Sequence, residues 1–127
     1  MAKLLIVEDD DSVRMFVSRA LERCGHQIEV AADGAQGLEM IKAAKGGYDL
    51  VLSDIRMPAM DGIEMAMSAA GLFPTLRLLL MTGYADQRER ADDLSKVIVD
   101  VVNKPFSLAE IRSRVDAALS VDLTHAA

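Results

Sequence analysis

The chain has 127 residues, 51% of them hydrophobic, which suits one globular domain and leaves no room for a second of ordinary size. It carries 14 basic and 20 acidic residues, with a formal net charge of −6, and the basic residues are scattered. Because binding to nucleic-acid phosphates needs a concentrated basic face, this balance argues against a nucleic-acid partner. The single cysteine, Cys24, cannot form a disulfide within the chain.

The amino-terminal segment holds one lysine and a short apolar run that meets acidic residues from Glu8 onward. It is too short and too soon interrupted to be a signal peptide or a membrane span. We therefore expect a cytoplasmic protein without a membrane partner. One domain is expected over residues 1–120, followed by a short tail over residues 121–127.

Five short apolar runs alternate with longer amphipathic stretches and predict a repeating βα pattern. The first, third and fourth runs are nearly continuous in Leu, Ile and Val, as in buried parallel strands, whereas the second alternates as an edge strand does. An α/β fold with a parallel sheet and helices on both faces follows. The predicted strands are Lys3–Val7, Gln27–Ala31, Asp49–Ser53, Arg77–Met81 and Val97–Val102.

Helical spacing of apolar residues predicts the first helix, with Asp10 or Asp11 as its N-cap and Gly25 as its stop. Its apolar stripe consists of Val13, Phe16, Val17, Ala20, Leu21 and Cys24.

Three more helices are predicted where a capping residue precedes Glu or Gln by three positions. These pairs are Asp33 with Gln36, Asp86 with Glu89, and Ser107 with Glu110. The helix from Asp86 to Ser95 has few apolar anchors, so we expect it to be the least firmly packed and the part that moves.

Polar residues follow four of the predicted strands, at the edge where the carboxyl ends of parallel strands gather and ligands bind. Glu8 and Asp9 follow the first strand, Asp54 the third, Thr82 the fourth and Lys104 the fifth. Each alone is ordinary loop chemistry: Glu8 could belong to a solvated capping run, Thr82 to a turn, and Lys104 to a strand end. Their coincidence at one edge indicates a site.

Three converging carboxylates predict a bound cation. Two unit charges 4 Å apart repel by about 1 kcal/mol in water and about 4 kcal/mol at an effective dielectric of 20. An all-oxygen donor set favours Mg²⁺ or Mn²⁺ over Zn²⁺. With Lys104 and Thr82 available to contact a phosphoryl group at Asp54, the set is suited to phosphoryl transfer onto a carboxylate.

The segments LLIVEDDDSVR, DLVLSDIRMPAMDG, LLLMTGYAD and VNKPFS resemble the signature regions of CheY-like response-regulator receiver domains over nearly the whole chain. The resemblance implies a flavodoxin-like (βα)5 fold with strand order 2-1-3-4-5. It also implies a bacterial two-component or phosphorelay protein that receives its phosphoryl group from a sensor histidine kinase or a histidine phosphotransferase. Its only catalysis would be its own phosphorylation and dephosphorylation.

By the same resemblance, Asp54 is the phosphorylation site. Asp9, Asp54 and the backbone carbonyl of Arg56 would hold Mg²⁺, with Glu8 acting through a metal-bound water. Thr82 and Lys104 would each contact a phosphoryl oxygen.

The resemblance also implies a cis bond before Pro105, and Gly83 matches the small residue that leaves the phosphorylation pocket accessible. The family usually has an aromatic residue three positions before the lysine, where this chain has Val101, so the chain departs from the usual coupling of the threonine to that aromatic. Tyr84 is an alternative reporter, or else a partly exposed loop tyrosine.

A narrower resemblance, to CpdR-type single-domain regulators, is carried by EDDDSVR, MTGYADQRER and KPFSLAEIR. It implies a phosphotransferase relay and an adaptor role in proteolysis by ClpXP, with ClpX as a candidate partner. Two other functions compete. An aspartyl-phosphate phosphatase would need a second acid two residues after Asp54, where Arg56 stands, and a flavodoxin-like redox module would place a flavin phosphate against an acidic loop.

Overall fold

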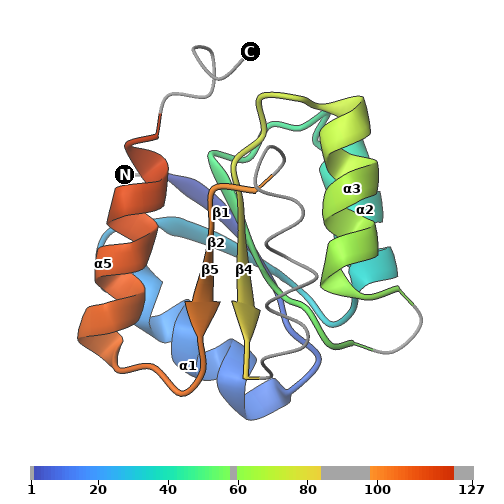
Figure 1. Ribbon diagram of the computed structural model, residues 1–127. Coiled ribbons are helices and arrows are strands. Elements are labelled where there is room, and N and C mark those ends of the chain that lie inside the picture. The colour runs from blue at the N-terminus through green and yellow to red at the C-terminus, as the bar shows by residue number, and fades with distance from the viewer. Residues whose placement is uncertain (1, 58–59, 84–97, 122–127) are drawn as a thin grey trace.

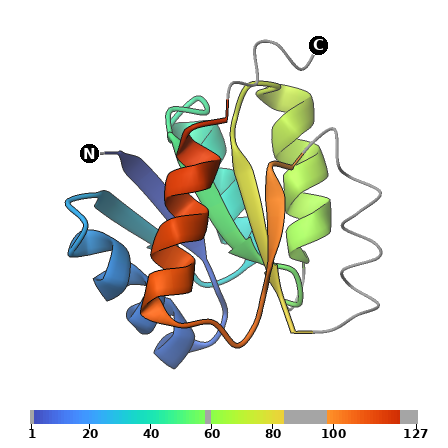
Figure 2. The ribbon, with the colours of Figure 1, turned by 60° about the vertical axis from the view of Figure 1, so that its left-hand side comes forward.

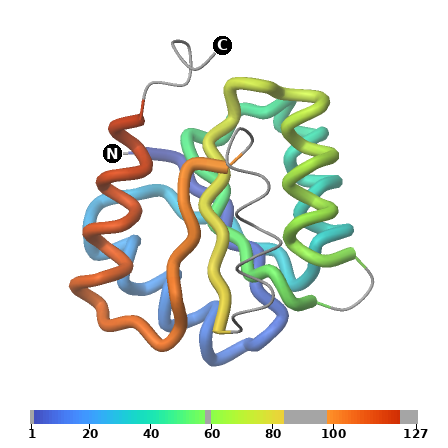
Figure 3. Tube along the Cα trace, in the orientation of Figure 1, coloured from blue at the N-terminus to red at the C-terminus, as the bar shows by residue number. Residues whose placement is uncertain are grey.

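The computed structural model describes residues 2–57, 60–83 and 98–121, which form a parallel five-stranded sheet with helices on both faces (Figure 1). The strand order is β2-β1-β3-β4-β5, which confirms the predicted topology and the edge position of β2. The tube in Figure 3 follows the chain from β1 out to β2, then through α2 back to β3 on the other side of β1. The described elements are β1 (Lys3–Val7), α1 (Asp11–Glu22), β2 (Gln27–Ala31), α2 (Gly34–Ala43), β3 (Leu50–Asp54), α3 (Gly62–Leu72), β4 (Leu78–Thr82), β5 (Asp100–Asn103) and α5 (Leu108–Leu119).

Three strands differ from prediction at both of their ends. β3 and β4 begin and end one residue later than their apolar runs, so Asp54 and Thr82 are the last residues of strands. The ladder extends to them because its hydrogen bonds are made by the backbone: Asp54 is in register with Met81, and Thr82 with Asn103. β5 begins at Asp100 rather than at residue 97, which lies outside the described residues, and it ends at Asn103, one residue later than predicted.

Helices α1 and α5 cover one face of the sheet, and α2 and α3 cover the other (Figures 1 and 2). The alternation of side chains along a strand divides the core accordingly. In β1, Leu4 and Ile6 join the cluster under α1 and α5, whereas Leu5 and Val7 join the cluster under α2 and α3. Both faces of the central strands are therefore buried, as their continuous apolar sequences predicted. No helix within the described ranges is long and apolar enough to cross a membrane.

The predicted helix starts are confirmed where the structure describes them. Asp10, Asp33 and Ser107 are N-caps, and Ser107 forms a complete capping box with Glu110. Phe16 was predicted to face the core but is 41% exposed, because the buried face of α1 is a narrower strip centred on Val17, Ala20 and Leu21. The helix predicted from Asp86 to Ser95 lies outside the described residues.

Two glycines allow helices α2 and α3 to begin against the backbone at the carboxyl edge of the sheet. A Cβ at Gly62 would lie 2.1 Å from the carbonyl oxygen of Asp54, and one at Gly34 would lie 2.2 Å from that of Met60. Neither position can hold a side chain without a backbone shift. The start of α3 is thereby packed directly on the last residue of β3.

At the opposite, amino edge of the sheet a polar cluster surrounds Tyr48. Its hydroxyl donates to Glu29 Oε1 at 2.7 Å, and Lys3 Nζ lies 5.1 Å from the centroid of its ring. Burial, reinforced by Glu29, raises the pKa of Tyr48 well above its usual value.

Candidate functional site

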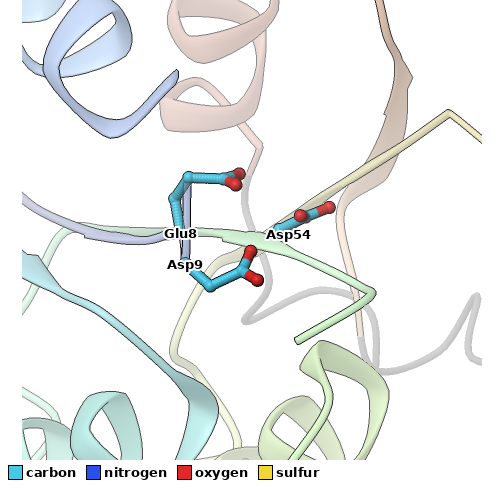
Figure 4. A group of neighbouring side chains, drawn as sticks. All are labelled: Glu8, Asp9 and Asp54. Carbon is cyan, nitrogen blue, oxygen red and sulfur yellow. The ribbon is translucent and has the colours of Figure 1, made fainter. Parts of the chain in front are cut away.

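Three carboxylates meet at the carboxyl edge of the sheet, as the sequence predicted (Figure 4). Glu8 and Asp9 follow β1, and Asp54 ends β3, the strand paired with β1. Each offers an oxygen, and these oxygens lie within 4.8 Å of one another. That spacing is comparable to the roughly 4 Å between opposite ligands of an octahedral Mg²⁺ site. The donor set and its spacing therefore fit a hard divalent cation.

Lys104 joins this cluster from the loop after β5. Its Nζ lies 3.1 Å from Glu8 Oε2 and 3.2 Å from Asp54 Oδ2, so one ammonium bridges the two acids. The peptide bond between Lys104 and Pro105 is cis, as predicted. The backbone amide of Lys104 donates to the carbonyl of Thr82 at 2.8 Å, which ties this loop to the end of β4.

Backbone amides hold the other oxygens of the two buried acids. The amide of Ile55 donates to Asp54 Oδ1 at 2.9 Å, and the amide of Asp10 donates to Glu8 Oε1 at 3.2 Å. Glu8 is 1% exposed, and each of its carboxylate oxygens accepts a hydrogen bond, one from Lys104 and one from the Asp10 amide. Asp9, by contrast, is exposed, so its carboxylate faces the solvent from which a cation would come.

The structure also locates the remaining predicted site residues. Thr82 is buried at the end of β4, and Gly83 follows it at the surface, where an added Cβ would lie 3.8 Å from Lys104 Cβ. Val101 is buried in the cluster under α2 and α3. Arg56 is exposed beside the acids, and Tyr84 lies outside the described residues.

An open cavity of about 870 Å³ contains the acids and extends over an apolar wall. The wall is made by Val13, Phe16 and Phe106, and the two phenylalanine rings stack with centroids 6.4 Å apart. The exposed position of Phe16 thus makes it part of the site rather than of the core. Sequence periodicity had placed Phe16 on the buried stripe because it cannot distinguish the core from the edge of a cavity.

One further contact was not foreseen from the sequence. Arg14, on the first turns of α1, donates from Nη1 to the backbone carbonyl of Glu8 at 2.8 Å. A signal was present in the sequence, because an arginine follows the acidic run by less than one helical turn. Nothing in that spacing, however, shows whether the guanidinium turns toward the loop or toward solvent.

Burial and the neighbouring charges shift the pKa values of Glu8, Asp54 and Lys104. Burial, followed by repulsion from Asp54, raises the pKa of Glu8 from 4.5 to about 7 against the opposing effect of Lys104. Burial also raises the pKa of Asp54, although Lys104 opposes that shift. For Lys104 burial acts downward, but Asp54 and Glu8 outweigh it and raise its pKa. Burial is thus the first cause of the raised pKa of both acids, and their attraction to Lys104 only partly offsets it.

We expect the stability of the protein in EDTA to fall as the pH rises from about 4.5 to about 7, the unfolded and folded pKa values of Glu8. Over that interval the folded state keeps a proton on Glu8 that the unfolded chain has released, at about 1.4 kcal/mol per pKa unit. Urea unfolding across this range measures the effect. Glu8→Gln should flatten the slope, whereas the exposed-site control Glu39→Gln should keep it; an unchanged slope in Glu8→Gln would contradict the assignment.

A parallel sheet of order 2-1-3-4-5 with carboxylates and a lysine at its carboxyl edge defines the CheY-like class of flavodoxin-like folds. Residues 4–116 match the family model of the response regulator receiver domain, and the chain belongs to that family. It is therefore a receiver domain of two-component signalling.

Individual relatives agree with this family. The chain is 33% identical over 119 residues to the response regulator receiver protein CpdR of Brucella abortus, covering 94% of this chain and 98% of that protein. It is 33% identical over 118 residues to the sensor kinase CckA of the same organism, of which it spans 12%. Among solved structures, response regulator TrrA of Thermotoga maritima, in complex with Mg²⁺ and BeF, has a TM-score of 0.82 and 29% identity, covering 93% of this chain and 99% of that one.

Proposed function

We propose that Asp54 accepts a phosphoryl group from a phosphohistidine on a sensor kinase or a histidine phosphotransferase, and that phosphorylation switches the binding of a partner protein. The convergence of Glu8, Asp9, Asp54 and Lys104 on one spot carries this proposal. The similarity to CpdR, and to a segment of the sensor kinase CckA, supports it.

The reaction uses the carboxylate of Asp54 as the nucleophile. As one of its oxygens bonds to phosphorus, the bond from phosphorus to the histidine nitrogen breaks, and the imidazole leaves with the electron pair. Lys104 already lies 3.2 Å from Asp54 Oδ2, so its ammonium can pair with the charge that arrives on the phosphoryl oxygens. Thr82, which ends the neighbouring strand, is the second proposed contact for those oxygens. The chain would turn over no small-molecule substrate.

Mg²⁺, or Mn²⁺, would be held by Asp9, Asp54 and the carbonyl of Arg56, with Glu8 acting through a bound water. When bound, the cation neutralises charge at the reacting phosphoryl group. The secondary role of Glu8 agrees with its geometry, because both its oxygens already accept hydrogen bonds, from Lys104 and from the Asp10 amide.

An amide-shift titration tests the site. Mg²⁺ should shift the resonances of Asp9, Asp10 and Ile55, and adding beryllofluoride, the group bound with Mg²⁺ in TrrA, should shift those of Lys104 and Gly83. The amides of Gln27 and Ile28, at the amino end of β2 and thus away from the acids, serve as the internal control. Unchanged shifts around Asp9 and Ile55 at millimolar Mg²⁺ would refute the site.

The resemblance to CpdR-type regulators makes ClpX a candidate output partner. We propose that the conformational signal passes through residues 82–95, with Tyr84 rather than Val101 as the reporter, because Val101 is a buried aliphatic side chain without a polar group. Binding of ClpX to Asp54→Ala, compared with the beryllofluoride-bound wild type, tests the partner. Equal binding by both forms would argue against a switched ClpX adaptor.

A further inference from the structure

We infer that Arg14 is a positioning residue that holds the loop after β1, so that the carboxylates of Glu8 and Asp9 meet Asp54. The inference rests on the proposed metal-dependent function. It assigns a role in that function to a residue that contacts neither the cation nor the phosphoryl group. In the contacts described above, Arg14 bonds to none of the three carboxylates of Glu8, Asp9 and Asp54. It bonds to the backbone carbonyl of Glu8 instead.

The guanidinium is fixed from both sides. Nη1 donates to the carbonyl of Glu8 at 2.8 Å, and Nη2 pairs with the carboxylate of Asp11, the first residue of α1. The backbone of Arg14 is itself anchored, because its amide donates to Asp10 at 2.9 Å and its carbonyl accepts from Ser18 Oγ at 2.7 Å. The planar guanidinium thus connects the backbone at Glu8 to the first residue of α1 and holds the turn between them.

The carbonyl of Glu8 needs this donor because the neighbouring strand ends beside it. The last residues in register between β1 and β2 are Val7 and Ala31, and the amide of Glu8 still donates to Ala31 at 3.1 Å. Beyond that point the amide of Ala32 donates to Gln36 Oε1, and Asp33 caps α2. The segment after β2 has turned away into α2, so Arg14 supplies the hydrogen bond at the point where the sheet ladder stops.

A purely electrostatic role for Arg14 makes the opposite prediction. A positive charge near a cation site repels the cation, so removing it would tighten Mg²⁺ binding. If Arg14 positions the loop, removing it weakens Mg²⁺ binding, because outer-shell contacts that orient metal ligands typically contribute roughly 10-fold or more in affinity. The sign of the change separates the two roles.

The experiment compares Arg14→Met and Arg14→Lys with Arg19→Met, a control on the exposed side of the same helix that removes the same charge. Mg²⁺ affinity is measured by calorimetry, and amide hydrogen exchange at Asp9 and Asp10 is measured in EDTA. We expect Arg14→Met to bind Mg²⁺ roughly 10-fold more weakly and Arg14→Lys to lie between it and the wild type. Exchange at Asp10 should quicken in Arg14→Met, while Leu21, which is buried in the last turn of α1, keeps its protection.

Equal or tighter Mg²⁺ binding by Arg14→Met, or Arg19→Met weakening it as much, would overturn the inference. If the wild type binds no Mg²⁺, the proposed function fails, and the exchange measurement in EDTA then decides the role of Arg14 alone. Unchanged exchange at Asp9 and Asp10 in Arg14→Met would show that the loop does not depend on this side chain.

Discussion

Asp54→Asn should abolish labelling of the protein by a small phosphodonor such as acetyl phosphate in the presence of Mg²⁺. An amide is a poor nucleophile, and it is a weaker ligand for a hard cation than a carboxylate. The fold should survive, because asparagine keeps an oxygen that can accept from the Ile55 amide, while Lys104 keeps Glu8 as a partner. Intact mass spectrometry, with hydroxylamine to cleave an acyl phosphate, measures the label.

Asp33→Asn is the matched control for this experiment. It removes the same charge from the N-cap of α2, where asparagine caps a helix as well as aspartate does. This variant should label as the wild type does. Label that persists in Asp54→Asn and maps to another residue would move the phosphorylation site; label lost equally in both variants would point to a general charge effect.

The second large effect is expected from Gly62→Ala. The added methyl group would lie 2.1 Å from the carbonyl oxygen of Asp54 and 3.0 Å from Ile55 Cα, both backbone atoms. Relief requires α3 to move away from the end of β3, which we expect to destabilise the protein by about 3 kcal/mol or more. Urea unfolding followed by circular dichroism measures the loss, and any folded fraction should bind Mg²⁺ more weakly because Asp54 has shifted.

The same substitution near the other end of α3 should have the opposite effect on the free energy of unfolding. A Cβ at Gly71 meets nothing within 4 Å, so Gly71→Ala gains helix propensity without a collision and should stabilise the protein by roughly 0.5–1 kcal/mol. Two variants of one helix thus separate the effect of the contact between Gly62 and the backbone of β3 from the general effect of replacing a helical glycine by alanine. A Gly62→Ala protein as stable as the wild type would refute the packing argument.

Much of this fold could be predicted because its determinants are local. Continuous apolar runs mark β1, β3 and β4, and the caps at Asp33 and Ser107 are read from residues three positions apart. The site was predictable for a related reason: parallel strands bring their carboxyl ends to one edge whatever the details of packing. Residues at those ends converge once the topology is known.

Other features depend on distances in the folded protein that a local sequence pattern cannot predict. The strand ends at Asp54 and Thr82 were placed one residue early, because apolarity stops before the backbone ladder does. The exposure of Phe16 depends on how far α1 is set toward the cavity, and the reach of Arg14 to Glu8 depends on a side-chain rotamer. These are properties of the packed molecule rather than of the periodicity of its sequence.

The position of Tyr48 has an optical consequence. The chain has two tyrosines and no tryptophan, so its near-ultraviolet absorbance comes chiefly from two phenols. Tyr48 lies beyond the amino end of β3, and Asp54 lies at the carboxyl end, at least about 13 Å away at the rise of a parallel strand. We therefore expect ions or phosphodonors at the acidic edge to leave the hydrogen bond from Tyr48 to Glu29 unchanged, so that a change in tyrosine absorbance on their addition would report on the other phenol, Tyr84.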